Sequence, residues 1–231
     1  MGLFGRLRRP RPYINPLLGQ RLHSLGEIAP PSLRRAHQVT RYVTVDVETT
    51  GIDLDRDRVI SIGAVAINGR RVDFADCFEI VLRQRESSDT SNILVHRIGG
   101  QRQRGGIDPA EALVQFLEFV QLSPLVAFRA DFDRIMLERE LDEVLGLRPH
   151  NLWLDLAKLM PALFPSNDNH TMDDWLKQFG IRMEARHDAV ADALATAQML
   201  QVCLAAADRV NMECPAQLDE MQRAQHWLGK R

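Results

Sequence analysis

Two carboxylates stand two positions apart, at Asp46 and Glu48, in a β-branched apolar segment. On a strand such residues share one face, with Cα atoms about 6–7 Å apart, so both can bind one cation. Hard oxygen ligands of this kind suit Mg²⁺ or Mn²⁺ better than zinc. The alternative is an exposed pair at a strand edge. The apolar segment argues against that alternative, because unpaired buried carboxylates are costly.

A third carboxylate, Asp133, follows the apolar run 125–128 by a few residues. In a parallel sheet, the residues at the carboxyl ends of the strands line the functional crevice. If residues 125–128 form such a strand, Asp133 lies close to its end, at the start of the next helix. The alternative role for Asp133 is a favourable charge in the first turn of that helix.

A histidine and a fourth carboxylate, His187 and Asp192, stand five positions apart at the start of an alanine-rich helix. Histidine can exchange a proton near neutral pH, which suits a general base. The same spacing occurs at His150 and Asp155. We favour His187 because Asp192 interrupts a long apolar helix, where solubility alone does not explain a charge. The alternative is a surface histidine beside a capped helix.

The elements that position these residues are strands first and helices later. Segments 42–48, 59–67 and 71–82 predict three strands, and Asn68-Gly69 predicts a hairpin between the last two. Residues 125–128 and 152–154 predict two more strands. Helices are predicted at 109–120, 131–145, behind Asp155, and at 171–179, 188–207 and 215–228. This order indicates an α/β fold, a mixed five-stranded sheet flanked by helices.

Charge and proline content divide the chain into three predicted parts. Residues 1–40 form a basic, proline-containing extension without sustained periodicity, so order is expected to begin at Arg41. Residues 41–208 form the domain with the four carboxylates, and residues 209–231 form a C-terminal helical segment. Residues 1–41 hold eight arginines and one glutamate. Such an arm binds nucleic acid or a partner, or is a solvated, poorly ordered terminus.

Cysteine usage and hydropathy bear on the compartment. The three cysteines, at positions 77, 203 and 214, form no Cys-x-x-Cys pair. That pattern indicates a reducing compartment, so we expect a cytoplasmic protein without a disulfide framework or structural zinc. The most apolar run, 189–207, contains Asp192 and two glutamines, which favours a core helix over a membrane span.

Taken together, the motifs resemble those of the DEDDh exonucleases, over roughly residues 42–204. The first motif is Asp46-Val47-Glu48-Thr49-Thr50-Gly51, the second ends in Phe132-Asp133, and the third runs from His187 to Asp192. Residues 95–98, Val-His-Arg-Ile, resemble the family's His-Gly-Ile loop. The resemblance implies a ribonuclease H-like fold, two divalent cations, and 3′→5′ removal of nucleotides.

The resemblance also assigns roles. Metal ligands and general base follow from the family motifs: Asp46, Glu48, Asp133 and Asp192 as ligands, and His187 as base. Substrate contacts are expected from Thr49, Thr50, Gly51 and His96, although a strand-to-loop turn and a surface histidine are the alternatives. Phe128-Arg129 departs from the family's His-Asn, and Arg129 is expected to grip a phosphate or to weaken metal binding.

Three functions remain open at this point. The favoured one is a DNA exonuclease that acts on single-stranded or frayed 3′ ends in proofreading or repair, with a polymerase or other replication protein as a possible partner. The second is an RNA-trimming exonuclease of the same fold. The third is a catalytically inactive nucleic-acid-binding module, and the intact set of four carboxylates and His187 argues against it.

Overall fold

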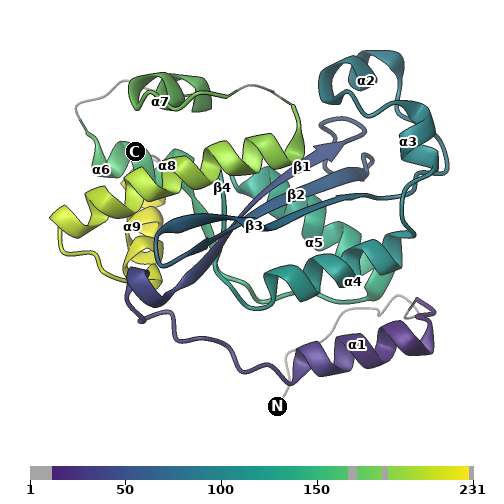
Figure 1. The fold of residues 1–231 in the computed structure, drawn as a ribbon, viewed down its shortest axis with the longest axis horizontal. Coiled ribbons are helices and arrows are strands. Elements are labelled where there is room, and N and C mark those ends of the chain that lie inside the picture. Colours follow the sequence, from purple (N-terminus) through teal and green to yellow (C-terminus); the bar gives the residue numbers. More distant parts are fainter. Residues whose placement is uncertain (1–11, 166–170, 184–186, 229–231) are drawn as a thin grey trace.

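The structure, a computed structural model, describes residues 12–165, 171–183 and 187–228. Its centre is a five-stranded sheet in the order β3-β2-β1-β4-β5 (Figure 1). The strands have these bounds: β1 Arg41–Thr49, β2 Val59–Asn68, β3 Arg71–Val81, β4 Leu125–Ala127 and β5 Trp153–Asp155. β1, β2 and β3 form an antiparallel meander, whereas β4 and β5 run parallel to β1. The prediction of a mixed five-stranded sheet is confirmed.

Helices cover both faces of this sheet (Figure 1). Their bounds are α1 Pro16–Gly26, α2 Thr90–His96, α3 Gly100–Arg104, α4 Pro109–Val120, α5 Asp131–Leu145, α6 Leu156–Leu163, α7 Met172–Gln178, α8 Ala189–Arg209 and α9 Pro215–Leu228. One apolar core lies between the sheet and α1, α4 and α5. The other lies between the sheet and α6, α7, α8 and α9. Burial of both faces explains why β2 is apolar almost throughout.

Several helices begin at the capping residues that the sequence suggests. The side chains of Asp108, Asp155 and Asp188 accept hydrogen bonds from backbone N–H groups in the first turns of α4, α6 and α8. Thr171 and Asp174 form a reciprocal capping box at α7. Each cap satisfies an N–H group that lacks a partner within the helix, so it fixes where the helix starts.

The N-terminal segment is more ordered than the sequence pattern suggests. Residues 16–26 form α1, which packs on α4, so the expectation that order begins at Arg41 is wrong. Arg21 makes bidentate contacts with two carboxylates of α4, Glu111 and Glu118, at 2.6–2.9 Å. From residue 12 onward this segment is therefore bound to the body of the protein. Whether residues 1–40, 41–208 and 209–231 act as separate domains remains a prediction.

The open edge of β5 is covered by α9. The side-chain amide of Gln222 donates to the Trp153 carbonyl at 2.8 Å and accepts from the Asp155 N–H at 2.9 Å. A neighbouring strand would make the same hydrogen bonds to the β5 backbone, so α9 protects this edge from pairing with another strand. The predicted C-terminal helix is present and supports the strand end from which Asp155 projects.

α8 is long and apolar enough to cross a membrane by length and composition, but 61% of its most apolar window is buried inside the protein. It packs against β1 and β2 as a core helix. Thr44 on β1 donates to the Ala193 carbonyl on α8 at 2.7 Å, which fixes the helix to the centre of the sheet. The interpretation of residues 189–207 as a core helix agrees with this packing.

Candidate active site

The site begins at the carboxyl end of β1, where Asp46 and Glu48 are partly buried. Asp46 pairs with Gly63 of β2 in the antiparallel register, and Glu48 pairs with Ser61. Two positions apart on one strand, the two carboxylates project from the same face of the sheet. The start of α8 lies on that face, as the contact of Gly63 with Ala189 shows.

α8 brings the third carboxylate to this point. Asp192 lies in the first turn of the helix and is 5% exposed. One carboxylate oxygen each from Asp46, Glu48 and Asp192 lies within 4.8 Å of the others. His187 precedes the helix in a left-handed conformation with φ of 60°, and its backbone N–H donates to Asp192 Oδ2 at 2.9 Å. That bond orients the Asp192 carboxylate and holds the backbone of His187 beside it.

Gly63 allows α8 to come this close to the sheet. A Cβ atom at Gly63 would lie 2.2 Å from the carbonyl carbon of Ala189 and 2.3 Å from its oxygen. Since real Cβ atoms do not approach backbone so closely, any larger residue must displace the start of α8. The absence of a side chain at Gly63 therefore sets the separation between Asp46 and Asp192.

Replacement of Gly63 by alanine is expected to lower the free energy of unfolding by about 1–3 kcal/mol through overpacking. It should also reduce catalytic turnover at this site about 10²-fold or more, because a shift of about 1 Å misplaces Asp192 and His187. Melting temperature and turnover measure the two effects. Gly19→Ala is the matched control, since a Cβ there meets nothing within 4 Å. Wild-type turnover in Gly63→Ala would contradict this account.

Asp133 lies beside β1 at the backbone between Asp46 and Glu48, and it is not one of the three clustered carboxylates. It lies in the first turn of α5, is 7% exposed, and its Oδ1 accepts the Val47 N–H at 3.2 Å. β4 pairs with β1 only as far as Thr44, so this carboxylate replaces a ladder bond beyond the end of β4. The backbone between Asp46 and Glu48 is thereby joined to α5.

Burial raises the pKa of Asp133 to about 7, with further contributions from the negative charges of Asp155 and Glu48. The bond from the Val47 N–H opposes this rise. A carboxyl group in this position carries a proton more readily than usual, and a bound cation would favour its charged form. Burial of the Asp133 carboxylate is costly, and a role as a metal ligand would explain why it is buried.

A cavity of about 310 Å³ lies beside the three clustered carboxylates, and Asp133 does not line it. It is lined by three of the predicted ligands, the predicted base and six neighbours: Asp46, Val47, Glu48, Phe128, Arg129, Thr171, Met172, Asp173, His187 and Asp192. His150 instead lines a groove between α5 and α9. Of the two His-x4-Asp pairs, only the one at His187 therefore shares a cavity with Asp46 and Glu48.

The sequence interpretation did not include the residues that α7 contributes to this cavity. Thr171, Met172 and Asp173 come from the start of that helix, and Asp173 adds a further carboxylate. The capping box at Thr171 was a signal for the helix start, but nothing local indicated that this start faces β1.

The family model described as exonuclease matches residues 43–200. The chain belongs to this exonuclease family.

Relatives of the exonuclease chain include polymerase proteins. A DNA polymerase III PolC-type protein of Clostridium perfringens is 34% identical over 165 residues, which cover 69% of this chain and 11% of that protein. A DNA polymerase III subunit epsilon-like protein of Rhodobacter capsulatus is 32% identical over 161 residues, which cover 68% of this chain and 23% of that protein. The chain thus spans less than a quarter of the length of either relative.

Among solved structures, E. coli exonuclease I in complex with a dT13 oligonucleotide superposes with a TM-score of 0.64 at 20% identity. The match covers 74% of this chain and 42% of that chain. At this identity the likeness concerns the fold, and it confirms the ribonuclease H-like architecture.

In this exonuclease, Arg129 occupies a left-handed position with φ of 62°, and its N–H donates to Asp155 Oδ1 at 2.9 Å. Its side chain is exposed at the cavity and has no hydrogen bond or ion pair within the described part of the chain. The nearby carboxylate of Asp131 contacts Arg134 at 3.1 Å and Lys158 at 3.0 Å. The guanidinium of Arg129 is therefore available to an anionic ligand.

The turn after β1 is held by its own side chains. Thr49 donates to the Gly51 carbonyl, and Thr50 donates to Asp57 Oδ1 at 2.7 Å. A Cβ at Gly51 would lie 2.4 Å from the Asp57 carboxylate, so glycine permits this close approach. The hydroxyl groups thus shape the turn, and contact of Thr49, Thr50 and Gly51 with a terminal nucleotide remains a prediction.

His96 lies away from the cavity and is 3% exposed. Its Nε2 contacts Asn92 Oδ1 at 2.7 Å, and its Nδ1 accepts the Ile98 N–H at 2.9 Å. Burial lowers the pKa of His96, so the ring is neutral at physiological pH. This geometry assigns His96 to holding the loop after α2; its contact with substrate remains a prediction.

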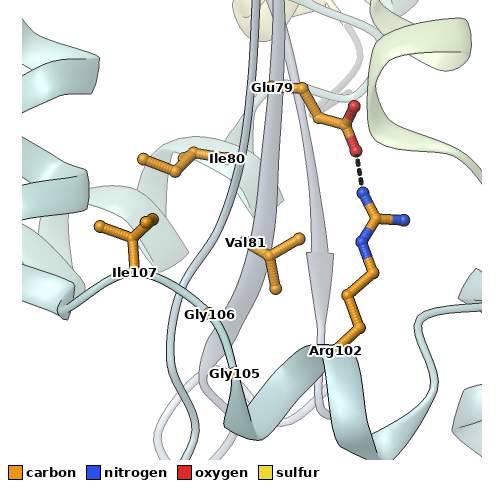
Figure 2. A pocket seen from close by; sticks show the side chains of 7 residues that line it. All are labelled: Glu79, Ile80, Val81, Arg102, Gly105, Gly106 and Ile107. Atoms are coloured by element: carbon orange, nitrogen blue, oxygen red, sulfur yellow. Dashed lines mark hydrogen bonds and ion pairs between the residues drawn. The ribbon is translucent and has the colours of Figure 1, made fainter.

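The arginines in the segment that follows β3 differ in their surroundings. Arg102 contacts Glu79 beside a cavity of about 270 Å³ at the edge of β3 (Figure 2). Arg83 contacts Asp108 at 2.6 Å. Arg85 and Arg97 are exposed and have no ion pair among the residues that the structure describes. These two are the better candidates for phosphate contacts.

Proposed function

We propose that this chain is a divalent-cation-dependent 3′→5′ exonuclease that removes nucleoside monophosphates from DNA ends. The observation that carries the proposal is the convergence of Asp46, Glu48 and Asp192 within 4.8 Å. His187 and Arg129 line the same cavity. An acidic cluster, a basic side chain and an imidazole are the groups that phosphodiester hydrolysis requires.

The donor set fits a hard cation. Asp46, Glu48 and Asp192 offer only carboxylate oxygens, and the buried Asp133 adds a fourth carboxyl group beside β1. Such donors suit Mg²⁺ or Mn²⁺ rather than zinc, which prefers nitrogen and sulfur. Two cations bound here would stabilise negative charge on the attacking and leaving oxygens of the phosphodiester.

The side chains of this chain supply the remaining steps. His187 accepts a proton as a water oxygen attacks the phosphorus, and the bond from phosphorus to the 3′ oxygen of the preceding nucleotide breaks. The leaving oxygen takes up a proton, so the products are a shortened strand and a nucleoside monophosphate. Arg129 holds a phosphate oxygen in the cavity. The Asp192 contact holds the backbone of His187 beside the carboxylates.

Support for DNA as substrate comes from the relatives. Two are described as DNA polymerase III proteins, and the exonuclease I neighbour was solved with an oligodeoxynucleotide. We propose single-stranded or frayed 3′ DNA ends as substrate, a polymerase or other replication protein as partner, and a cytoplasmic location. All three cysteines are unpaired, which is consistent with that compartment.

The experiment is digestion of matched 5′-labelled DNA and RNA strands with Mg²⁺, with Mn²⁺ and with EDTA. The proposal predicts a ladder of products shortened from the 3′ end on DNA, and none with EDTA. Faster digestion of RNA would favour the RNA-trimming function. Binding of either strand without cleavage in both cations would identify an inactive nucleic-acid-binding module and overturn the proposal.

Replacement of Arg129 by alanine is expected to raise KM about tenfold and to change kcat less, because a charge-assisted contact made in the bound substrate is lost. Its backbone bond to Asp155 does not depend on the side chain, so the melting temperature should stay constant. Steady-state kinetics and thermal melts measure both quantities. Arg134→Ala is the control, since Arg134 pairs with Asp131 outside the cavity. A lower melting temperature with unaltered KM would reject the phosphate-binding role.

A further inference from the structure

α5 carries a second buried carboxylate that the proposed mechanism does not use. Glu140 lies seven residues after Asp133, which places the two on the same side of the helix, about 10 Å apart along its axis. The Glu140 side chain is only 4% exposed. Asp133 contacts β1, whereas Glu140 contacts the segment that follows β1.

That segment, residues 50–58, is tied to α5 by two arginines. Arg58 Nη2 donates to Glu140 Oε1 at 2.8 Å, and Arg58 Nη1 contacts Glu143 one turn further along. Arg139 of the same helix donates to the Leu54 carbonyl. The middle and the last residue of the segment are thus joined to the helix that holds Asp133.

The backbone of Arg58 also closes the turn after β1. Its N–H donates to Thr50 Oγ1 at 2.9 Å, and its carbonyl accepts the Thr50 N–H at 2.9 Å. A displacement of Arg58 therefore displaces Thr50 and its neighbour Gly51. The contacts run without a gap from Glu140 through Arg58 to this turn.

Stability alone does not explain this arrangement. Glu140 Oε2 is buried without a hydrogen-bond partner among the described residues, and burial raises the pKa of its carboxyl group despite the nearby Arg58. Apolar residues of similar volume are often as stable as a buried ion pair. What an ion pair adds here is a fixed distance between α5 and the turn.

We propose that Glu140 is a positioning residue of this exonuclease site. Through Arg58 it holds the Thr49–Gly51 turn at a set place relative to Asp133, and so it controls how tightly the end of a nucleic-acid strand is bound. The inference rests on the proposed function, since it assigns the turn to substrate binding. Glu140 acts through Arg58 and has no role in proton transfer.

The test compares Glu140→Gln and Arg58→Met with Asp142→Asn. The control lies on the same helix, where Asp142 pairs with Arg148 at an exposed position. We expect Glu140→Gln and Arg58→Met to raise KM about 3- to 30-fold, with kcat within about twofold of wild type and an unchanged dependence on Mg²⁺ concentration. Asp142→Asn should match wild type in all three quantities.

The assays are run well below the melting temperature of each variant, so that a loss of stability does not appear as a kinetic change. Anisotropy of a labelled oligodeoxynucleotide, with Ca²⁺ in place of Mg²⁺, should show the same weakening of binding as KM. If Arg58→Met does not fold, Arg58→Lys, which keeps the charge but only one contact, should give a smaller rise in KM.

The outcomes separate this inference from the proposed function. Wild-type protein that neither cleaves nor binds DNA overturns the proposed function. Active wild type with an unchanged KM in Glu140→Gln overturns only the positioning role. A fall in kcat with an altered Mg²⁺ dependence also overturns it, because Glu140 would then act on Asp133 instead of on the turn.

Discussion

Replacement of Asp46 by alanine is expected to reduce nuclease turnover about 10³-fold or more. Asp46 contributes to a cluster of three carboxylates within 4.8 Å, so its loss leaves Glu48 and Asp192 unable to hold a cation in the same place. Stabilisation of the developing phosphate charge by cations contributes several kcal/mol, which corresponds to this factor. Turnover of a 5′-labelled single strand with Mg²⁺ measures the effect.

The fold should survive this change. In metal-free buffer, removal of one of three close carboxylates relieves electrostatic repulsion, so the melting temperature of Asp46→Ala should equal or exceed that of wild type. Asp142→Asn, on the exposed side of α5, is the control and should retain full turnover. Near-normal turnover in purified Asp46→Ala would show that the motif on β1 is not the catalytic site.

Most of the fold could be predicted because its signals are local. The apolar runs, the Asn68-Gly69 turn and the capping residues each depend on neighbours in sequence, and they gave the strand order along the chain and most helices. The same holds for Asp46 and Glu48, whose shared face follows from strand geometry alone. Placement of Asp192 beside them required only that the last long helix pack on the sheet.

What could not be predicted depends on partners far away in sequence. α1 has Leu18 and Leu22 at helical spacing and packs them into the core, but its attachment to α4 also depends on Arg21, which binds carboxylates 90 and 97 positions away. Arg102 forms an ion pair with Glu79 of β3. Asp173 lines the cavity next to β1 because the tertiary fold brings the start of α7 to that place. Local patterns hold no information about these contacts.

His96 shows how a local pattern can mislead about burial, because the alternative of a surface histidine does not hold in the structure. A histidine in a polar loop resembles a surface ligand, yet the loop folds into α2 and buries the ring against its own residues. The bonds that satisfy the ring run to Asn92 and Ile98, four and two positions away. The sequence does not indicate these hydrogen bonds, because the segment lacks the length and the apolar period of a typical helix.

Replacement of His187 by alanine is expected to lower turnover by about 10²–10⁴-fold, the contribution of a positioned general base. The side chain lines the cavity beside the carboxylates, while the bond that it shares with Asp192 comes from its backbone N–H. The substitution therefore removes the imidazole and leaves the carboxylate cluster oriented. Cation-dependent binding of an oligodeoxynucleotide should remain within a few-fold of wild type.

His187→Asn and His150→Ala make the test specific. Asparagine tolerates the left-handed backbone of this position better than most residues, yet it cannot accept the proton, so it should be as slow as alanine. His150 has the same spacing to Asp155 but lines the groove beside α9, and its loss should leave turnover unchanged. A crippled His150→Ala with an active His187→Ala would move the base to the other side of the sheet, away from Asp46 and Glu48. Restoration of turnover in His187→Ala by added imidazole would show that the missing group is a base and not a structural contact.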